Sequence, residues 1–254
     1  GLMLVVAYMG YILFKAYTQP NKVPNHVGEP IAPGLAMRVV KSLLPPLILI
    51  LLVLGSILAG YATPTEAASL GALGALLLAL FNRKLSLGVL NTVMQNTLKV
   101  TSMIFLIFIG AAFFSLVFRG LGGDELITEL LTDLPGGVFT AMLIVMVLMF
   151  ILGFFLDFIE ITYVVVPVVA PILLMMGVDP IWLGIMIAIN LQTAFLTPPF
   201  GFALFYLRGV SPPELDTKAL YRGVIPFILI QLSMLAILAI WPEIVTWLPG
   251  LVYN

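Results

Sequence analysis

The sequence has 254 residues, of which 62% are hydrophobic and 9% are charged, and its formal net charge is −1. Soluble domains carry about 25% charged residues, so the composition excludes an ordinary soluble fold, and the charge balance gives no basic surface for nucleic acid. The absence of cysteine excludes disulfides, thiolate nucleophiles and cysteine-based metal sites. We predict an all-α polytopic membrane protein, because helices satisfy their own backbone groups in lipid and these apolar runs lack the alternation of barrel strands.

The N-terminal region combines an apolar segment with a polar linker. Residues 1–17 are expected to form a first membrane span, and residues 18–42 a proline-containing linker that includes the single histidine, His26. Lysine and arginine outnumber glutamate in this linker, which places it in the cytoplasm. Gly1 already lies in an apolar run without a signal-peptide layout. We therefore expect the sequence to be the C-terminal part of a longer protein.

The next region, residues 43–81, contains two apolar runs, 43–60 and 67–81. Thr63 before Pro64, with Glu66 in the turn that follows, predicts the N-terminus of a second helix. Basic residues flank both outer ends, so a re-entrant helical hairpin and two full spans with a tight outer turn both fit. The second run is short for a span, which needs roughly 20 residues, and this favours the hairpin.

The middle and the end of the chain add further apolar runs. Residues 85–96 are amphipathic and are expected to lie at the membrane interface. The loop 119–137 carries four carboxylates against one arginine and is expected outside, which also leaves the C-terminus on the outer side. About seven to eight membrane segments are expected in all. The spans in this part are residues 98–118, 138–156, 161–177 and 223–241.

The apolar segment 181–208 cannot be one continuous helix. Pro198 and Pro199 lack the amide hydrogen, Thr197 precedes a proline, and Gly201 adds backbone freedom. Unpaired backbone groups cost several kcal/mol each in lipid, so such a break requires protein or a polar cavity around it. Broken helices at this depth commonly build the ion or substrate sites of carriers, and a Pro-kinked packing helix is the alternative. The two expected half-helices are residues 181–195 and 200–208.

Two Thr-Pro elements therefore interrupt apolar runs, and polar residues gather at both. Threonine hydroxyls and freed carbonyls are neutral oxygen ligands that suit a weakly held monovalent cation such as Na⁺. Glu66 could ligate a cation or cap the helix that follows it. The polar residues at the second element are Asn190, Gln192, Thr193 and Thr197.

Asp157 and Glu160 are the only acids in the long apolar stretch 138–178. At i and i+3 on a helix they share a face, which would suit a proton relay or a metal-binding carboxylate pair. The expected topology places them instead at a cytoplasmic turn, where hydrated carboxylates need no function. We favour this structural interpretation.

The two Thr-Pro elements also carry a family resemblance. The run Gly60-Tyr-Ala-Thr-Pro-Thr-Glu-Ala-Ala68 resembles the G-x-x-TPTEAA signature of the large membrane subunit of TRAP (tripartite ATP-independent periplasmic) transporters, the DctM-like subunit. Asn190-Leu191 followed by Leu196-Thr-Pro-Pro-Phe-Gly201 resembles its second signature, NL-x-x-x-x-x-TPP-x-G. The residues 119–124 and 192–196 are closest to the mannitol/chloroaromatic-type branch. Residues 1–35 resemble the start of the family's C-terminal half, so residues 43–254 would form its C-terminal transport repeat.

The resemblance implies one half of an inverted-repeat, elevator-type secondary transporter in the inner membrane of a bacterium or archaeon. It would import a small organic acid delivered by a periplasmic binding protein, driven by Na⁺ as the coupling ion, with no other cofactor and no enzymatic activity. Its partners would be the N-terminal half of the same subunit, a small four-span membrane subunit and the lipid bilayer. A structural or assembly subunit, or an embedded enzyme using Asp157 and Glu160, are the alternatives.

The resemblance also assigns residues to the expected binding region. One group would line the hairpin tip and the other the broken helix, with Na⁺ expected at the four threonines. The assigned residues are Gly60, Thr63, Thr65, Asn190, Thr193, Thr197, Pro198 and Gly201, to which the polar pattern adds Glu66 and Gln192.

Overall fold

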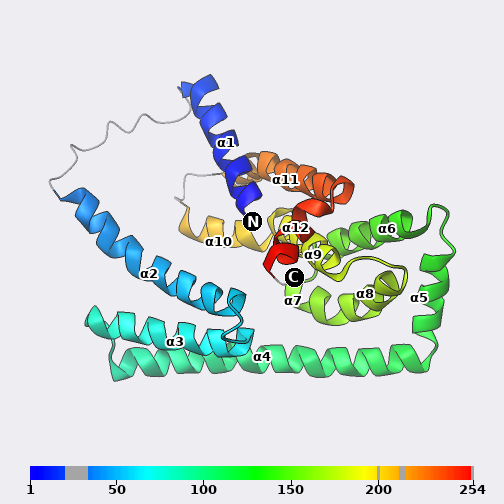
Figure 1. Cartoon of the computed structure of the whole chain (residues 1–254), viewed down its shortest axis with the longest axis horizontal. Helices are drawn as coiled ribbons and strands as arrows, with labels where there is room; N and C mark the ends of the chain where they lie inside the picture. Colours follow the sequence, from blue (N-terminus) through cyan, green and yellow to red (C-terminus); the bar gives the residue numbers. More distant parts are fainter. Residues whose placement is uncertain (21–33, 199–200, 212–215, 253–254) are drawn as a thin grey trace. The chain divides into compact units, whose positions relative to one another are not determined.

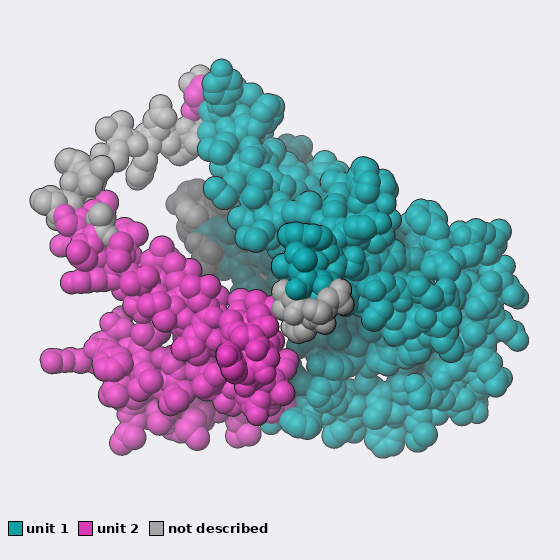
Figure 2. Space-filling model, in the orientation of Figure 1, with its two compact units in different colours: residues 1–18, 102–254 teal, residues 19–101 magenta. Residues whose placement is uncertain are grey.

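The computed structural model describes residues 1–20, 34–198, 201–211 and 216–252. In these ranges the regular elements are helices, and no strand occurs among them. This confirms the predicted all-α class. Residues 21–33 of the expected linker 18–42, His26 among them, lie outside the described residues. The end of that range is not a linker, because the helix α2 begins at Leu35. The chain divides into two compact units, residues 19–101 and residues 1–18 with 102–254 (Figure 2).

The helices are labelled in Figure 1. A π-helix, η2 (Ile161–Val165), joins α7 to α8. The α-helices are α1 (Leu2–Thr18), α2 (Leu35–Leu58), α3 (Pro64–Phe81), α4 (Leu87–Gly120), α5 (Gly123–Thr132), α6 (Gly137–Leu152), α7 (Phe158–Glu160), α8 (Val166–Met175), α9 (Pro180–Leu196), α10 (Phe202–Val210), α11 (Thr217–Ile240) and α12 (Glu243–Val252).

Many of these helices have the length and composition of membrane spans. Among the described residues, five helical segments are long and apolar enough to cross a membrane. Three shorter helices, α1, α6 and α9, are also apolar. A helix keeps its backbone hydrogen bonds internal, which is what a bilayer requires of a spanning segment. The five segments are Met37–Leu58, Pro64–Phe81, Leu87–Gly120, Phe158–Met175 and Thr217–Ile240.

Several helices are longer than the sequence predicts. Pro45 and Pro46 lie inside α2 rather than in its first turn, because the preceding residues are mostly good helix formers and extend the helix to Leu35. The expected interfacial helix and the span after it form one continuous helix, α4. No proline or glycine lies between residues 89 and 109, so nothing in the sequence ends the helix there. The acidic loop contains α5, and the tail contains α12.

In the unit of residues 19–101, α2 and α3 pack against each other. Small residues on α3 allow this approach. A Cβ added at Gly71 would touch Val53, and one added at Gly74 would overlap the end of the Leu49 side chain. The two apolar runs of the expected hairpin therefore lie side by side.

In the other unit, α9 is the central helix and packs against α6, α10, α11 and α12. α1 packs on α11, where Tyr8 and Tyr11 meet Phe227 edge to face. The core is apolar and is built mainly by α6, α8, α9 and α11. Among the described residues, its buried polar side chains are Asn190, Thr193 and Gln231, of which the first two lie on α9.

Candidate functional site

The first interruption, residues 59–63 between α2 and α3, is called the first break. α2 ends there in a Schellman motif. Gly60, with φ 72°, donates its N–H to the Ile57 carbonyl at 3.0 Å, and Tyr61 donates to the Ser56 carbonyl at 2.9 Å. This pattern satisfies carbonyls that the end of a helix would otherwise leave open.

α3 then begins with a capping box, as the Thr-Pro-x-Glu pattern predicts. The Thr63 backbone N–H and its hydroxyl both donate to Glu66 Oε2 at 2.8 Å, and the Glu66 N–H donates to the Thr63 hydroxyl at 3.4 Å. Pro64 occupies the first turn, where its missing N–H costs nothing. Glu66 is therefore engaged as a cap of α3.

The four candidate residues at the first break lie within one short turn. Gly60, Thr63, Thr65 and Glu66 are all exposed within their unit. The Thr65 carbonyl accepts a hydrogen bond from the Ser69 hydroxyl at 3.3 Å. The break thus meets most of its hydrogen-bonding needs from its own sequence.

The second interruption, residues 197–201 between α9 and α10, is called the second break; its residues 199 and 200 lie outside the described ones. Thr197 has extended dihedrals, φ −92° and ψ 130°, as a residue before a proline prefers. Its N–H donates to the Ala194 carbonyl at 3.0 Å, and Pro198 offers no further donor. Gly201, with φ 40°, begins α10 in a left-handed conformation that favours glycine.

A ladder of polar side chains leads along α9 to this break. Asn190 Nδ2 donates to the Met146 carbonyl of α6 at 2.8 Å. The Thr193 hydroxyl donates to the Ile189 carbonyl, and the Thr197 hydroxyl to the Thr193 carbonyl, each at 2.8 Å. Asn190 is 2% exposed and Thr193 is 0% exposed, whereas Thr197 is half-buried.

The structure separates Gln192 from this ladder. Asn190, Thr193 and Thr197 follow one another at helical spacing and share a face, and Pro198 adjoins them. Gln192 is exposed on another face of α9. The candidates at the second break thus form one group without Gln192, and the hairpin candidates belong to the other compact unit.

The chemistry of the ladder suits a cation. A threonine hydroxyl has one donor and two acceptor lone pairs, and the donors of Thr193 and Thr197 are used by backbone carbonyls. Their oxygen lone pairs are neutral acceptors, fully buried at Thr193 and half-buried at Thr197. The C-terminal end of a helix carries the negative end of its dipole, and Thr197 lies at that end of α9.

Sequence reasoning missed the packing that holds α9 in place. Gly153 follows α6, and a Cβ added there would overlap the Ala194 methyl group. Phe158 meets Phe195 with 6.4 Å between ring centroids. A glycine that follows a long apolar run gives no periodic signal, so only the assembled helices show that residues 153–158 lie against the end of α9.

Asp157 and Glu160 have a local structural role in this turn. Asp157 Oδ1 accepts from the Phe158 N–H at 2.7 Å, and the Asp157 N–H donates to Glu160 Oε2 at 3.3 Å. The two carboxylates form a capping box on α7. In the described part of the chain, no group of three or more His, Cys, Asp or Glu side chains is arranged to hold a metal ion.

Comparison with known proteins gives a consistent match. Residues 1–244 match the family described as "Tripartite ATP-independent periplasmic transporter, DctM component". The chain is 28% identical over 272 residues to the C4-dicarboxylate TRAP transporter large permease protein DctM of Vibrio cholerae, covering 99% of this chain and 58% of that protein. It is 29% identical over 211 residues to the sialic acid TRAP transporter large permease protein SiaM of Vibrio cholerae, with coverages of 83% and 48%.

A third relative is the ectoine/5-hydroxyectoine TRAP transporter large permease protein UehC of Ruegeria pomeroyi. The identity is 28% over 256 residues, covering 100% of this chain and 58% of that protein. The chain thus spans about half the length of the curated relatives it matches.

Proposed function

The chain belongs to the DctM-component family of tripartite ATP-independent periplasmic (TRAP) transporters, and we propose that it forms part of the large permease subunit of a Na⁺-coupled importer of small organic acids. It is a multi-pass integral membrane protein, which we assign to the inner membrane with its C-terminus on the periplasmic side. In this proposal a periplasmic binding protein delivers the substrate, and a small four-span subunit completes the permease.

The proposal rests mainly on the geometry of the second break. Its ladder combines two threonine oxygens, a buried amide and the C-terminal end of α9 within one short stretch. Na⁺ is weakly held by neutral oxygens, and a helix C-terminus favours a cation. We assign the main Na⁺ site to Thr193 and Thr197. A second contact at Thr63 and Thr65 remains part of the proposal.

The first break is proposed to contribute to substrate binding. The N-terminus of α3 is the positive end of its dipole and favours anions. Because the Glu66 carboxylate already occupies part of this positive end, we propose that the substrate carboxylate approaches it together with the cation at Thr63 and Thr65. The names of the three relatives give three different substrates, so the proposal extends to a substrate class and not to one compound.

The transport reaction is tested by reconstituting the complete subunit with its small subunit in proteoliposomes. Uptake of a substrate loaded on the binding protein should rise with an inward Na⁺ gradient and fall when K⁺ replaces Na⁺. Collapse of the Na⁺ gradient with an ionophore is the control for leakage. Uptake that is indifferent to Na⁺ would contradict the coupling.

We further propose that α2 and α3 form a re-entrant hairpin within an elevator-type fold. The short connection at the first break and the packing of α2 on α3 support this arrangement. The 254 residues contain no cysteine, so Tyr61→Cys introduces a single thiol into this chain at an exposed position of the tip. An impermeant maleimide should not label it from the outside, whereas Asp133→Cys in the acidic loop should react. Rapid outside labelling of Tyr61→Cys would favour two full spans.

A further inference from the structure

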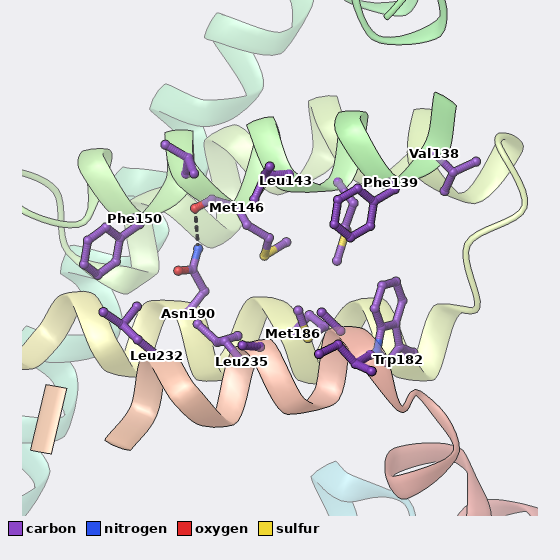
Figure 3. Close-up of a pocket in the computed structure, with 15 residues that line it drawn as sticks. Val138, Phe139, Leu143, Met146, Phe150, Trp182, Met186, Asn190, Leu232 and Leu235 are labelled. Carbon is purple, nitrogen blue, oxygen red and sulfur yellow. Dashed lines mark hydrogen bonds between the residues drawn. The ribbon is translucent and has the colours of Figure 1, made fainter. Parts of the chain in front are cut away.

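An apolar cavity of about 670 Å³ lies between α6, α9 and α11 (Figure 3). α6 forms one wall with Phe139, Leu143 and Met146, and α9 and α11 form the opposite wall (Figure 3). Ligand pockets typically measure roughly 300–1,000 Å³, so the cavity is large enough to hold a ligand. It is separate from the threonines of the second break, none of which lines it.

The side-chain nitrogens of Asn190 and Trp182 on the cavity wall donate to backbone carbonyls. Asn190 Nδ2 donates to the Met146 carbonyl at 2.8 Å, and Trp182 Nε1 donates to the Leu238 carbonyl at 2.8 Å. The lining residues include no acid and no base. A charged ligand would lose its hydration here without gaining a partner, which is strongly unfavourable. The lining therefore excludes the carboxylate of an organic acid and favours hydrocarbon.

The cavity wall continues onto the outer apolar surface of the same helices. Leu143 of α6 is 52% exposed and Ile240 of α11 is 65% exposed, and both also line the cavity. In a multi-pass membrane protein, the outer apolar faces that no other protein covers adjoin lipid hydrocarbon. Where lipid adjoins these two helices, a continuous apolar path leads from it into the cavity.

We propose that this cavity binds an acyl chain of a membrane phospholipid, with the headgroup left at the membrane surface. Hydrocarbon is the occupant whose chemistry matches the wall, and the bilayer is its source. α9 contributes Trp182, Met186 and Asn190 to the wall, so a bound chain contacts the helix that ends at the second break. The site does not depend on the transport reaction and would exist whether or not the protein couples to Na⁺.

Trp182 provides a direct reporter, because it lies on the cavity wall. The complete subunit is prepared with every other tryptophan, Trp241 and Trp247 among them, replaced by phenylalanine. It is then reconstituted in phospholipid that is brominated on its acyl chains, which quench a tryptophan on contact. We expect Trp182 to lose most of its emission relative to the same protein in unbrominated lipid.

Variants that occupy the cavity separate a bound chain from lipid at the outer surface. Ala239→Phe places a ring in the cavity and should restore most of the Trp182 emission. Ala236→Phe is the second such variant, for use if the first does not fold. Ala112→Phe, on an exposed face of α4 away from the cavity, should leave the quenching unchanged.

Two results would overturn the proposal. Unchanged quenching in a folded cavity variant would show that the lipid lies outside the cavity. Absence of quenching in the parent protein would show that another part of the permease covers the cavity. Neither result bears on Na⁺ coupling, so this test and the uptake test fail independently.

Discussion

The two breaks share a Thr-Pro dipeptide but use the threonine at opposite helix ends. At the first break, Thr63 is the N-cap of the helix that follows, and its hydroxyl is bound to Glu66. At the second break, Thr197 is the C-cap of the helix that precedes, and its hydroxyl donates to the Thr193 carbonyl. The first break lies at the positive end of the α3 dipole, and the second break lies at the negative end of the α9 dipole. The same dipeptide therefore creates an anion-favouring end in one place and a cation-favouring end in the other.

The two breaks also differ in what holds them. The first is closed by a Schellman motif and a capping box, both made from residues 56–66. The second depends on residues distant in sequence, since α9 is held by the Met146 carbonyl and by Gly153. A turn that is held by its own neighbouring residues should tolerate substitutions elsewhere in the chain. A break that is held by packing should be weakened by substitutions at the distant residues that contact it. The following predictions test this difference, from the largest effect to the smallest.

Thr197→Val is expected to have the largest effect on transport. It replaces a hydroxyl by a methyl group of similar size, and it removes both the oxygen proposed to bind the cation and the hydrogen bond that this hydroxyl donates to the Thr193 carbonyl. We expect a loss of about ten-fold or more in apparent Na⁺ affinity, equivalent to about 1.4 kcal/mol, measured as the Na⁺ dependence of uptake in proteoliposomes. Thr63→Val should lose less, because the Thr63 oxygen is already engaged in the cap of α3.

Thr128→Val is the matched control for Thr197→Val. The Thr128 hydroxyl also donates to a carbonyl four residues earlier, that of Asp124 at 2.6 Å, but it lies on α5. Thr128→Val should leave the apparent Na⁺ affinity of uptake unchanged. If Thr197→Val kept the Na⁺ dependence of the parent protein, the cation would not bind at the second break.

Gly153→Ala is expected to destabilise the unit that contains α9. The new methyl group would overlap that of Ala194, and overpacking of this kind costs about 1–3 kcal/mol. Thermal unfolding in detergent measures the loss, and Ala194→Gly in the same protein should recover part of it, as coupled neighbours do. Gly74→Ala on α3 is the control, because its neighbour is the flexible end of Leu49. If Gly153→Ala and Gly74→Ala lowered the stability equally, the second break would depend on packing no more than the first.

Thr63→Ala is expected to weaken α3 at its start. Loss of an N-cap typically costs about 1 kcal/mol, which thermal unfolding would register as a lower midpoint. Thr63→Asn should recover most of the loss, since asparagine is an equally good N-cap. A Thr63→Ala protein as stable as the parent would mean that the first break is held by something other than its capping box.

The sequence predicts local features of this fold and misses those made by packing. Proline, glycine and the Thr-x-x-Glu pattern act within a few residues, so both breaks and the start of α3 could be predicted. The bond from Asn190 to the Met146 carbonyl and the approach of Gly153 to Ala194 join segments more than 40 residues apart. A single sequence carries no signal for such pairs, which exist only once the helices are assembled.

Gln192→Ala is expected to have the smallest effect. The side chain is exposed on α9 and lies off the face that carries Asn190, Thr193 and Thr197, so its removal should change stability by less than about 0.5 kcal/mol. Na⁺-dependent uptake should also be unchanged. Asn190→Ala, two residues earlier, is the contrasting variant, because it removes a buried hydrogen bond to α6 and leaves a cavity. If Gln192→Ala instead abolished uptake and Asn190→Ala did not, the functional face of α9 would be the opposite one, and the threonine oxygens would lose their role as cation ligands.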